Sequence, residues 1–102
     1  MDVSININKM VYNKSFHRAG GNAYSAEVNI VGGGNDRVSI FNGTLFDIAD
    51  KGLQKVFEMA LANEYSGLVI TVNGASALSA SLQTHLVDKF IAEDEIASVT
   101  FV

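Results

Sequence analysis

The sequence predicts an α/β domain in which a five-stranded mixed sheet packs against two helices. Three observations predict it. Segments of alternating apolar and polar residues, typical of strands, occupy much of the first forty residues. Two later segments carry apolar residues at three- and four-residue spacing, as amphipathic helices do, and each is followed by another strand pattern. The expected order of elements is therefore β-β-β-α-β-α-β in a single domain, residues 1–102.

The first strand is predicted over residues 3–7, where apolar and polar residues alternate strictly. A lysine then falls where an apolar residue is due, so we expect a bulge near Asn8-Lys9 or the end of the strand. Residues 13–22, which include two adjacent glycines, predict a loop.

Two further strands complete an antiparallel meander. Residues 24–30 show the clearest alternation in the chain, and Val38 and Ile40 predict a returning strand. The glycine-rich segment 32–36 turns the chain between them. It contains no lysine and leads into a strand rather than a helix, so it is not a phosphate-binding loop.

A long amphipathic helix is predicted to begin at Thr44, which with Asp47 forms a relative of the capping box, and to end near Gly67. Alternatively, Asn42-Gly43 forms a two-residue hairpin turn and the helix begins near Asp47. We favour the longer helix because Leu45 fits the apolar stripe. The stripe consists of Leu45, Ile48, Ala49, Gly52, Leu53, Val56, Phe57, Ala60 and Leu61.

The second half of the chain predicts a strand, a helix and a strand. Residues 68–72 lack alternation and are mostly β-branched, which predicts a central strand buried on both faces. A second helix follows, with large apolar residues at four-residue intervals over 78–90 and Ser76 or Ser79 as its N-cap. Residues 97–101 alternate again and predict the last strand.

Strand-helix-strand units in one sheet form right-handed parallel crossovers, so the last two strands should be parallel. A meander extended by such units resembles the ribonuclease-H-like fold in its order of elements, over most of the chain. The resemblance implies, for an active enzyme, metal ions held by carboxylates on the first strand, the first helix and the end of the fourth strand. Here the first strand offers only Asp2, the fourth ends in Asn73, and Asp47 and Asp50 are explained by the helix dipole. We therefore expect no enzyme activity, no catalytic or metal site and no cofactor.

The composition narrows the classes of function. The chain has no cysteine, which excludes disulfides and thiolate chemistry and favours a reducing compartment. Its formal charge of −4 makes nucleic acid an improbable partner for broad, charge-driven binding. Neither a signal peptide nor a membrane span is indicated, so we expect a cytoplasmic protein without a membrane partner.

Two surface segments are candidates for contact with another protein. The first concentrates two basic residues, a histidine and an aromatic residue; the alternative is a solvated loop with its phenylalanine tucked onto the core. The second is an acidic turn, which either solvates a turn or complements a basic partner. The segments comprise Lys14, Phe16, His17 and Arg18, and Glu93, Asp94 and Glu95.

A weaker candidate is an anion site at Asn73, Gly74 and Ser76, where a strand joins a helix N-terminus without a nucleotide-binding motif. His17 and His85 have no partners in a triad-like or metal-binding spacing, so a surface role is favoured for both.

Three functions of different class follow from these patterns. The preferred one is a small acidic interaction module that binds another protein without catalysis, as an inhibitor or adaptor of a nucleic-acid-handling complex. The first alternative is a ribonuclease-H-like domain that binds or processes nucleic acid, with degenerate catalysis. The second alternative is a homodimeric structural or small-ligand protein that pairs through the edge of its last strand.

Overall fold

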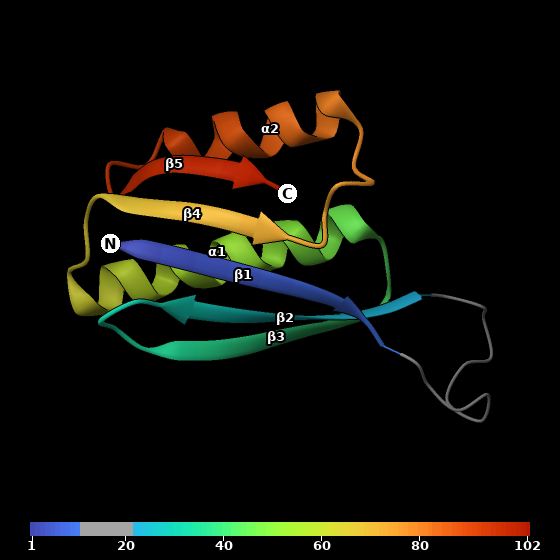
Figure 1. The fold of residues 1–102 in the computed structure, drawn as a ribbon, viewed down its shortest axis with the longest axis horizontal. Helices are drawn as coiled ribbons and strands as arrows, with labels where there is room; N and C mark the ends of the chain where they lie inside the picture. The colour runs from blue at the N-terminus through green and yellow to red at the C-terminus, as the bar shows by residue number, and fades with distance from the viewer. Residues whose placement is uncertain (11–21) are drawn as a thin grey trace.

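The computed structural model, which describes residues 1–10 and 22–102, consists of one five-stranded sheet with two helices packed on the same face (Figure 1). The molecule measures 42 × 29 × 18 Å, as expected of two layers. The predicted order of elements and the mixed sheet are confirmed. The elements are β1 (Asp2–Lys9), β2 (Asn22–Ile30), β3 (Asn35–Gly43), α1 (Leu45–Asn63), β4 (Leu68–Asn73), α2 (Ala80–Ile91) and β5 (Ile96–Phe101).

The strands lie in the order β3-β2-β1-β4-β5, so β1 is central and β3 and β5 form the two edges. β1 pairs antiparallel with β2, and β2 with β3, as a meander does. β4 lies parallel to both β1 and β5. The predicted parallel arrangement of the last two strands is therefore confirmed.

Both helices lie on one face because of how the chain crosses the sheet. The connection from β3 through α1 to β4 and the connection from β4 through α2 to β5 step across the sheet in the same direction. Right-handed crossovers that step in one direction place their helices on the same side. No helix of the described part of the chain covers the opposite face of the sheet.

The prediction that residues 68–72 are buried on both faces is therefore wrong. β4 alternates, with Leu68, Ile70 and Val72 fully buried beneath the helices, whereas Val69 on the other face is 43% exposed. Because Val69 is itself apolar, the sequence of β4 does not show this alternation. β4 is an interior strand, flanked by β1 and β5, but it is covered on one side only.

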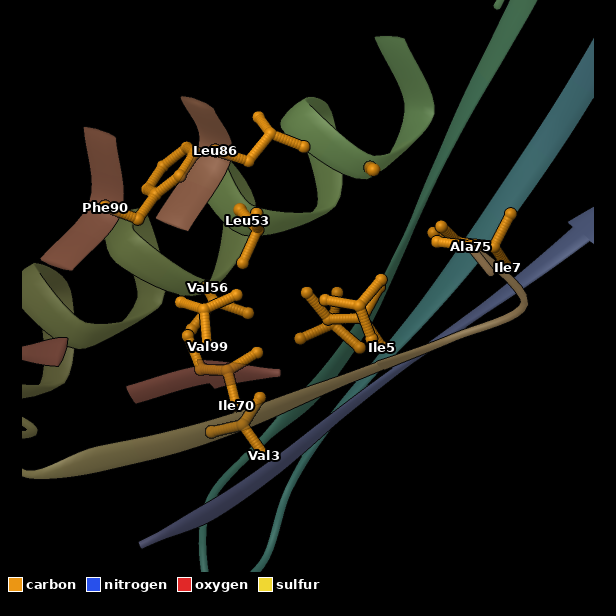
Figure 2. Close-up of a cluster of buried hydrophobic side chains, with 14 of the residues drawn as sticks. Val3, Ile5, Ile7, Leu53, Val56, Ile70, Ala75, Leu86, Phe90 and Val99 are labelled. Carbon is orange, nitrogen blue, oxygen red and sulfur yellow. The ribbon is translucent and has the colours of Figure 1, made fainter. Parts of the chain in front are cut away.

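The core fills the space between the sheet and the helices. Figure 2 shows Ile5 of β1 and Ile70 of β4 on the helix side of the sheet, with Leu53 of α1 directed toward the sheet; Leu86 of α2 belongs to the same buried cluster. All four side chains are fully buried. α1 approaches β1 closely at Gly52, where an added Cβ would lie 3.0 Å from Ile5 Cγ2. A larger residue at 52 would push the helix away from the sheet.

The start of α1 agrees with the longer-helix interpretation. Thr44 is the N-cap, its Oγ1 accepts from the Asp47 N–H (3.2 Å), and Asp47 Oδ2 accepts from the Thr44 N–H (2.8 Å). This is the reciprocal capping box. The hairpin alternative is wrong, because Asn42, despite its φ of 57°, belongs to the end of β3.

The predicted end of α1 at Gly67 is wrong. The helix ends at Asn63, and Glu64 closes it in the left-handed conformation, with φ 57°. Gly67, with φ 65°, instead shapes the turn into β4. Leu61 also departs from expectation, since this last member of the predicted apolar stripe is 57% exposed.

Strand and helix ends agree with the predictions in two places and depart from them in two. β1 ends at Lys9, which is one of the two predicted alternatives, and a register shift lies between β2 and β3, near Tyr24. Ser79, one of the two predicted N-caps, caps α2, whereas Leu82 on the predicted stripe of that helix is 39% exposed. In β5 a register irregularity leaves Ala97 exposed. Among the described residues, neither helix is long and apolar enough to cross a membrane.

The one-sided burial of β4 predicts opposite outcomes for neighbouring substitutions, whereas the sequence pattern alone predicts loss of folding for both. Ile70→Asp places an unpaired carboxylate in the core, at a cost of several kcal/mol against a total stability of about 5 to 15 kcal/mol. Val69→Asp, on the face of the sheet away from the helices, should lower the free energy of unfolding by about 1 kcal/mol or less. Urea unfolding followed by circular dichroism measures both. Equal destabilisation by the two variants would contradict the two-layer arrangement.

Candidate functional site

The two predicted contact segments have different outcomes. Lys14, Phe16, His17 and Arg18 lie outside the residues that the structure describes. Glu93, Asp94 and Glu95 form the turn between α2 and β5, and two of them, Asp94 and Glu95, line a surface groove together with the end of α1. The groove, here called the acidic groove, has a volume of about 340 Å³. It is lined by Ala60, Leu61, Glu64, Tyr65, Ser66, Asp94 and Glu95.

The acidic groove is built where two chain reversals meet. The left-handed conformation of Glu64 turns the chain at the end of α1, and the Tyr65 N–H donates to the Ala60 carbonyl (2.9 Å). The Leu68 N–H, at the start of β4, donates to the carbonyl of Glu95 (3.0 Å). That bond holds the acidic turn next to the segment that follows α1.

The electrostatics of the acidic groove favour a cation. Glu64, Asp94 and Glu95 contribute three carboxylates, and none of the described residues that line the groove is a lysine or arginine. The last turn of α1 has no basic residue either, although a helix C-terminus carries a partial negative charge that usually attracts one. The helix end and the carboxylates therefore both attract a positive charge to the acidic groove.

The apolar part of the groove adds a second preference. Leu61 is largely exposed beside the half-buried ring of Tyr65. Lysine and arginine side chains combine an apolar stem with a charged head, and their heads are attracted to aromatic rings. The groove thus has the chemistry to hold one such side chain, with its stem on Leu61 and Tyr65 and its charge near the carboxylates.

Sequence reasoning identified the acidic turn but missed Leu61, Glu64 and Tyr65. The spacing of Leu61 predicts a buried residue of the apolar stripe, and Gly67 predicts a helix end beyond Glu64. The absence of any lysine or arginine between residues 56 and 67 was the available signal, since it leaves the C-terminal part of α1 without a compensating charge.

The predicted anion site has its local groups engaged within the protein. The Asn73 side-chain amide donates to Asn6 Oδ1 (3.0 Å), and the Gly74 N–H donates to the Val102 carbonyl (3.1 Å). Ser76 is exposed in the loop before α2. An anion at this loop stays a prediction.

The carboxylates weighed for metal chemistry also have structural partners. Asp47 caps α1, while Asp50 binds Lys89 of α2 (2.7 Å) and accepts from Gln54 (2.8 Å). Within residues 1–10 and 22–102, no cluster of three or more His, Cys, Asp or Glu side chains is arranged to hold a metal ion. His85 is exposed on α2, its ring 5.9 Å from that of Phe46.

The helix-free side of the sheet, here called the open face, is lined mainly by small polar side chains. In the middle of it Asn6 of β1 lies opposite Glu27 on one side and Asn73 on the other. Glu27 in turn pairs with Arg37 of β3. The outward residues besides Val69 include Ser4, Asn6, Asn8, Ser25, Glu27, Asn29, Arg37, Ser39, Thr71, Asn73, Ser98 and Thr100.

Comparison with known proteins bears on the fold alone. No protein-family model and no curated protein sequence matches the chain. Among solved structures, the chain is similar to one described as the crystal structure of LC9-RNase H1, a type 1 RNase H with the type 2 active-site motif. The identity is 14%, the TM-score is 0.47, and the match covers 99% of this chain. The chain spans only 62% of that protein's length, and the likeness carries no conclusion about activity.

The left-handed conformation of Glu64 predicts that glycine is more stable than alanine at this position. A non-glycine residue in the left-handed region costs about 1 to 2 kcal/mol, which glycine avoids. Glu64→Gly should therefore raise the free energy of unfolding by about 0.5 to 1 kcal/mol relative to Glu64→Ala, measured by urea titration. A glycine variant no more stable than the alanine variant would contradict this explanation.

Proposed function

We propose that the protein is a non-enzymatic interaction module whose acidic groove binds a lysine or arginine side chain presented by a partner protein. The observation that carries the proposal is the meeting of three carboxylates, a helix C-terminus and an exposed leucine in one groove without a basic residue. A reducing, cytoplasmic setting, which the cysteine-free sequence favours, belongs to the same proposal.

The mode of binding follows from the two halves of the groove. Charge complementarity mainly accelerates association and is screened by salt, because exposed charges interact over about 8 Å at physiological ionic strength. Contact between Leu61 and the apolar part of a partner side chain mainly slows dissociation. A partner with a basic surface, such as a protein that handles nucleic acid, fits both requirements.

Nucleic-acid binding is a second candidate, which a cleft between β3 and α1 favours. Lys51 and Lys55 of α1 line this cleft of about 320 Å³ together with Arg37 of β3, whose guanidinium is paired with Glu27 on the open face. A hydrogen bond to Glu58 and the attraction of Asp36 raise the pKa of Lys55. The nearby carboxylates weaken this candidate, because Arg37 pairs with Glu27 and Lys55 with Asp36 and Glu58.

The two candidates predict different losses in one capture experiment. Wild-type protein and three variants are used to capture material from native lysate. The acidic-groove variant combines Leu61→Ser, Asp94→Asn and Glu95→Gln, and the basic-cleft variant combines Arg37→Gln and Lys51→Gln. The third variant, Asp88→Asn, is an exposed control. We expect a protein partner that the acidic-groove variant alone loses. Surface plasmon resonance with that purified partner should then show a salt-dependent association rate, reduced about tenfold or more in the groove variant.

The contrary outcomes are equally specific. A captured nucleic acid that the basic-cleft variant alone loses would establish the second candidate. A protein partner retained equally by the acidic-groove variant and by Asp88→Asn would show that the acidic groove is not the binding surface.

A further inference from the structure

β5 is an edge strand, and no strand of residues 1–10 or 22–102 pairs with its outer side. Its inner side is bonded to β4, as shown by the Val102 N–H, which donates to the Val72 carbonyl (2.9 Å), and by the Val102 carbonyl, which accepts from Gly74 (3.1 Å). Alternate residues of a strand bond to the same neighbour. The N–H and C=O groups of Val99 and Phe101 therefore point away from β4, toward the free edge.

This edge lacks the features that usually prevent a further strand from adding. The β5 sequence, residues 96–101, contains no charged residue and no proline. The opposite edge strand, β3, carries Asp36 and Arg37. Charged residues and prolines are the common protection of edge strands, so the two edges of this sheet differ in kind. Only the β5 edge is chemically open along its length.

The helix α2 shapes the space beside this edge. In Figure 1, α2 lies beyond β5, outside the last strand of the sheet. A groove of about 380 Å³ runs between them, with Val99 and Phe101 on the strand side. Its helix side presents the short side chains of Ala80, Thr84 and Val87 and the longer Gln83, whose amide donates to the Leu78 carbonyl (3.0 Å). The groove thus leaves room for side chains that an added strand would direct toward α2.

The position of α2 favours a peptide segment over a second copy of the chain as the occupant. A second copy that added its own β5 would also bring its own α2 over the same junction. That junction already holds one helix beyond the strand. A single extended segment brings no helix.

The charge at one end of the edge specifies the occupant further. The acidic turn of Glu93, Asp94 and Glu95 immediately precedes β5. A segment lying along β5 therefore has one end beside three carboxylates. An antiparallel segment, the more stable pairing per residue, places its C-terminal end there.

We propose that the β5 edge binds an extended segment of a partner protein by antiparallel strand addition. Alternate small apolar side chains of the segment fill the groove under α2, and a basic residue near its C-terminal end faces the acidic turn. This proposal rests on the interaction-module function and names the form of the partner; its surface shares Asp94 and Glu95 with the acidic groove but does not include Leu61. Main-chain hydrogen bonds supply affinity in such complexes, and the side-chain groove supplies specificity.

The test uses the whole protein and the synthetic peptide acetyl-Val-Thr-Val-Thr-Val-Arg-amide. Amide hydrogen exchange is followed by NMR with peptide at about 1 mM, which detects dissociation constants up to the millimolar range. We expect the Val99 and Phe101 amides to exchange at least about twofold more slowly with peptide, because they gain hydrogen-bond partners and about half of the protein is bound when the dissociation constant equals the peptide concentration. A peptide ending in Glu instead of Arg should protect them less.

Two matched variants locate the effect. Thr84→Trp fills the groove and should abolish the protection, whereas Ser81→Trp, also exposed on α2, should leave it intact. Leu61→Ser should also leave it intact, so this result stands apart from that of the acidic groove. Unchanged Val99 and Phe101 exchange with peptide would overturn the proposal. It would equally be overturned if both amides were already protected in a dimer at high protein concentration, since the occupant would then be a second copy.

Discussion

The handedness of the two crossovers is the constraint on which the rest of this structure depends. Both connections step the same way across the sheet, so both helices must lie on one face. The whole apolar core is therefore built between one side of the sheet and two helices. The other side carries mainly Asn, Ser and Thr and a Glu27–Arg37 pair, and the strands also expose the apolar residues Val69 and Phe41.

The same constraint places the surfaces that the sheet offers to partners. α1 packs on β1, β2 and β3. Its C-terminal end and the turn before β5 together line the acidic groove. α2 packs on β5, the last strand, and lies out beyond its edge. Both proposed binding surfaces are thus places where a helix ends or overhangs, whereas the middle of the sheet supplies stability.

Local rules of folding are broken most clearly around the acidic groove. Leu61 continues an apolar stripe yet is exposed, Glu64 occupies a conformation that glycine adopts more easily, and the last turn of α1 lacks a basic residue. Each departure costs some stability. Natural proteins tend to depart from such rules at functional sites, so three departures within four residues distinguish this groove from the other surfaces.

The sequence was sufficient for the element order, the parallel last strands and the Thr44 capping box, because each depends on local spacing or on a general rule of chirality. It was insufficient where an apolar residue faces solvent. Val69 made β4 resemble a strand buried on both sides, and Leu61 extended the predicted buried stripe of α1. Whether the residues at the end of a helix's apolar stripe are buried depends on how far the sheet extends beneath the helix.

The site was predicted less completely than the fold for the same reason. The acidic turn stands out in the sequence as three successive acidic residues. Its partner in the groove, the end of α1, lies some thirty residues earlier and is joined to it only through the pairing of β4 with β5. Contacts between segments so far apart follow from strand register, which local patterns do not specify.

Site-specific photo-crosslinking in the native cells tests the central claim most directly. A photoreactive amino acid is introduced at Leu61 in the acidic groove and, as a matched control, at Thr71 on the open face. The account predicts a covalent adduct with a protein from position 61 and none from position 71. A crosslink from position 71 alone, or an adduct with nucleic acid in place of protein, would contradict it.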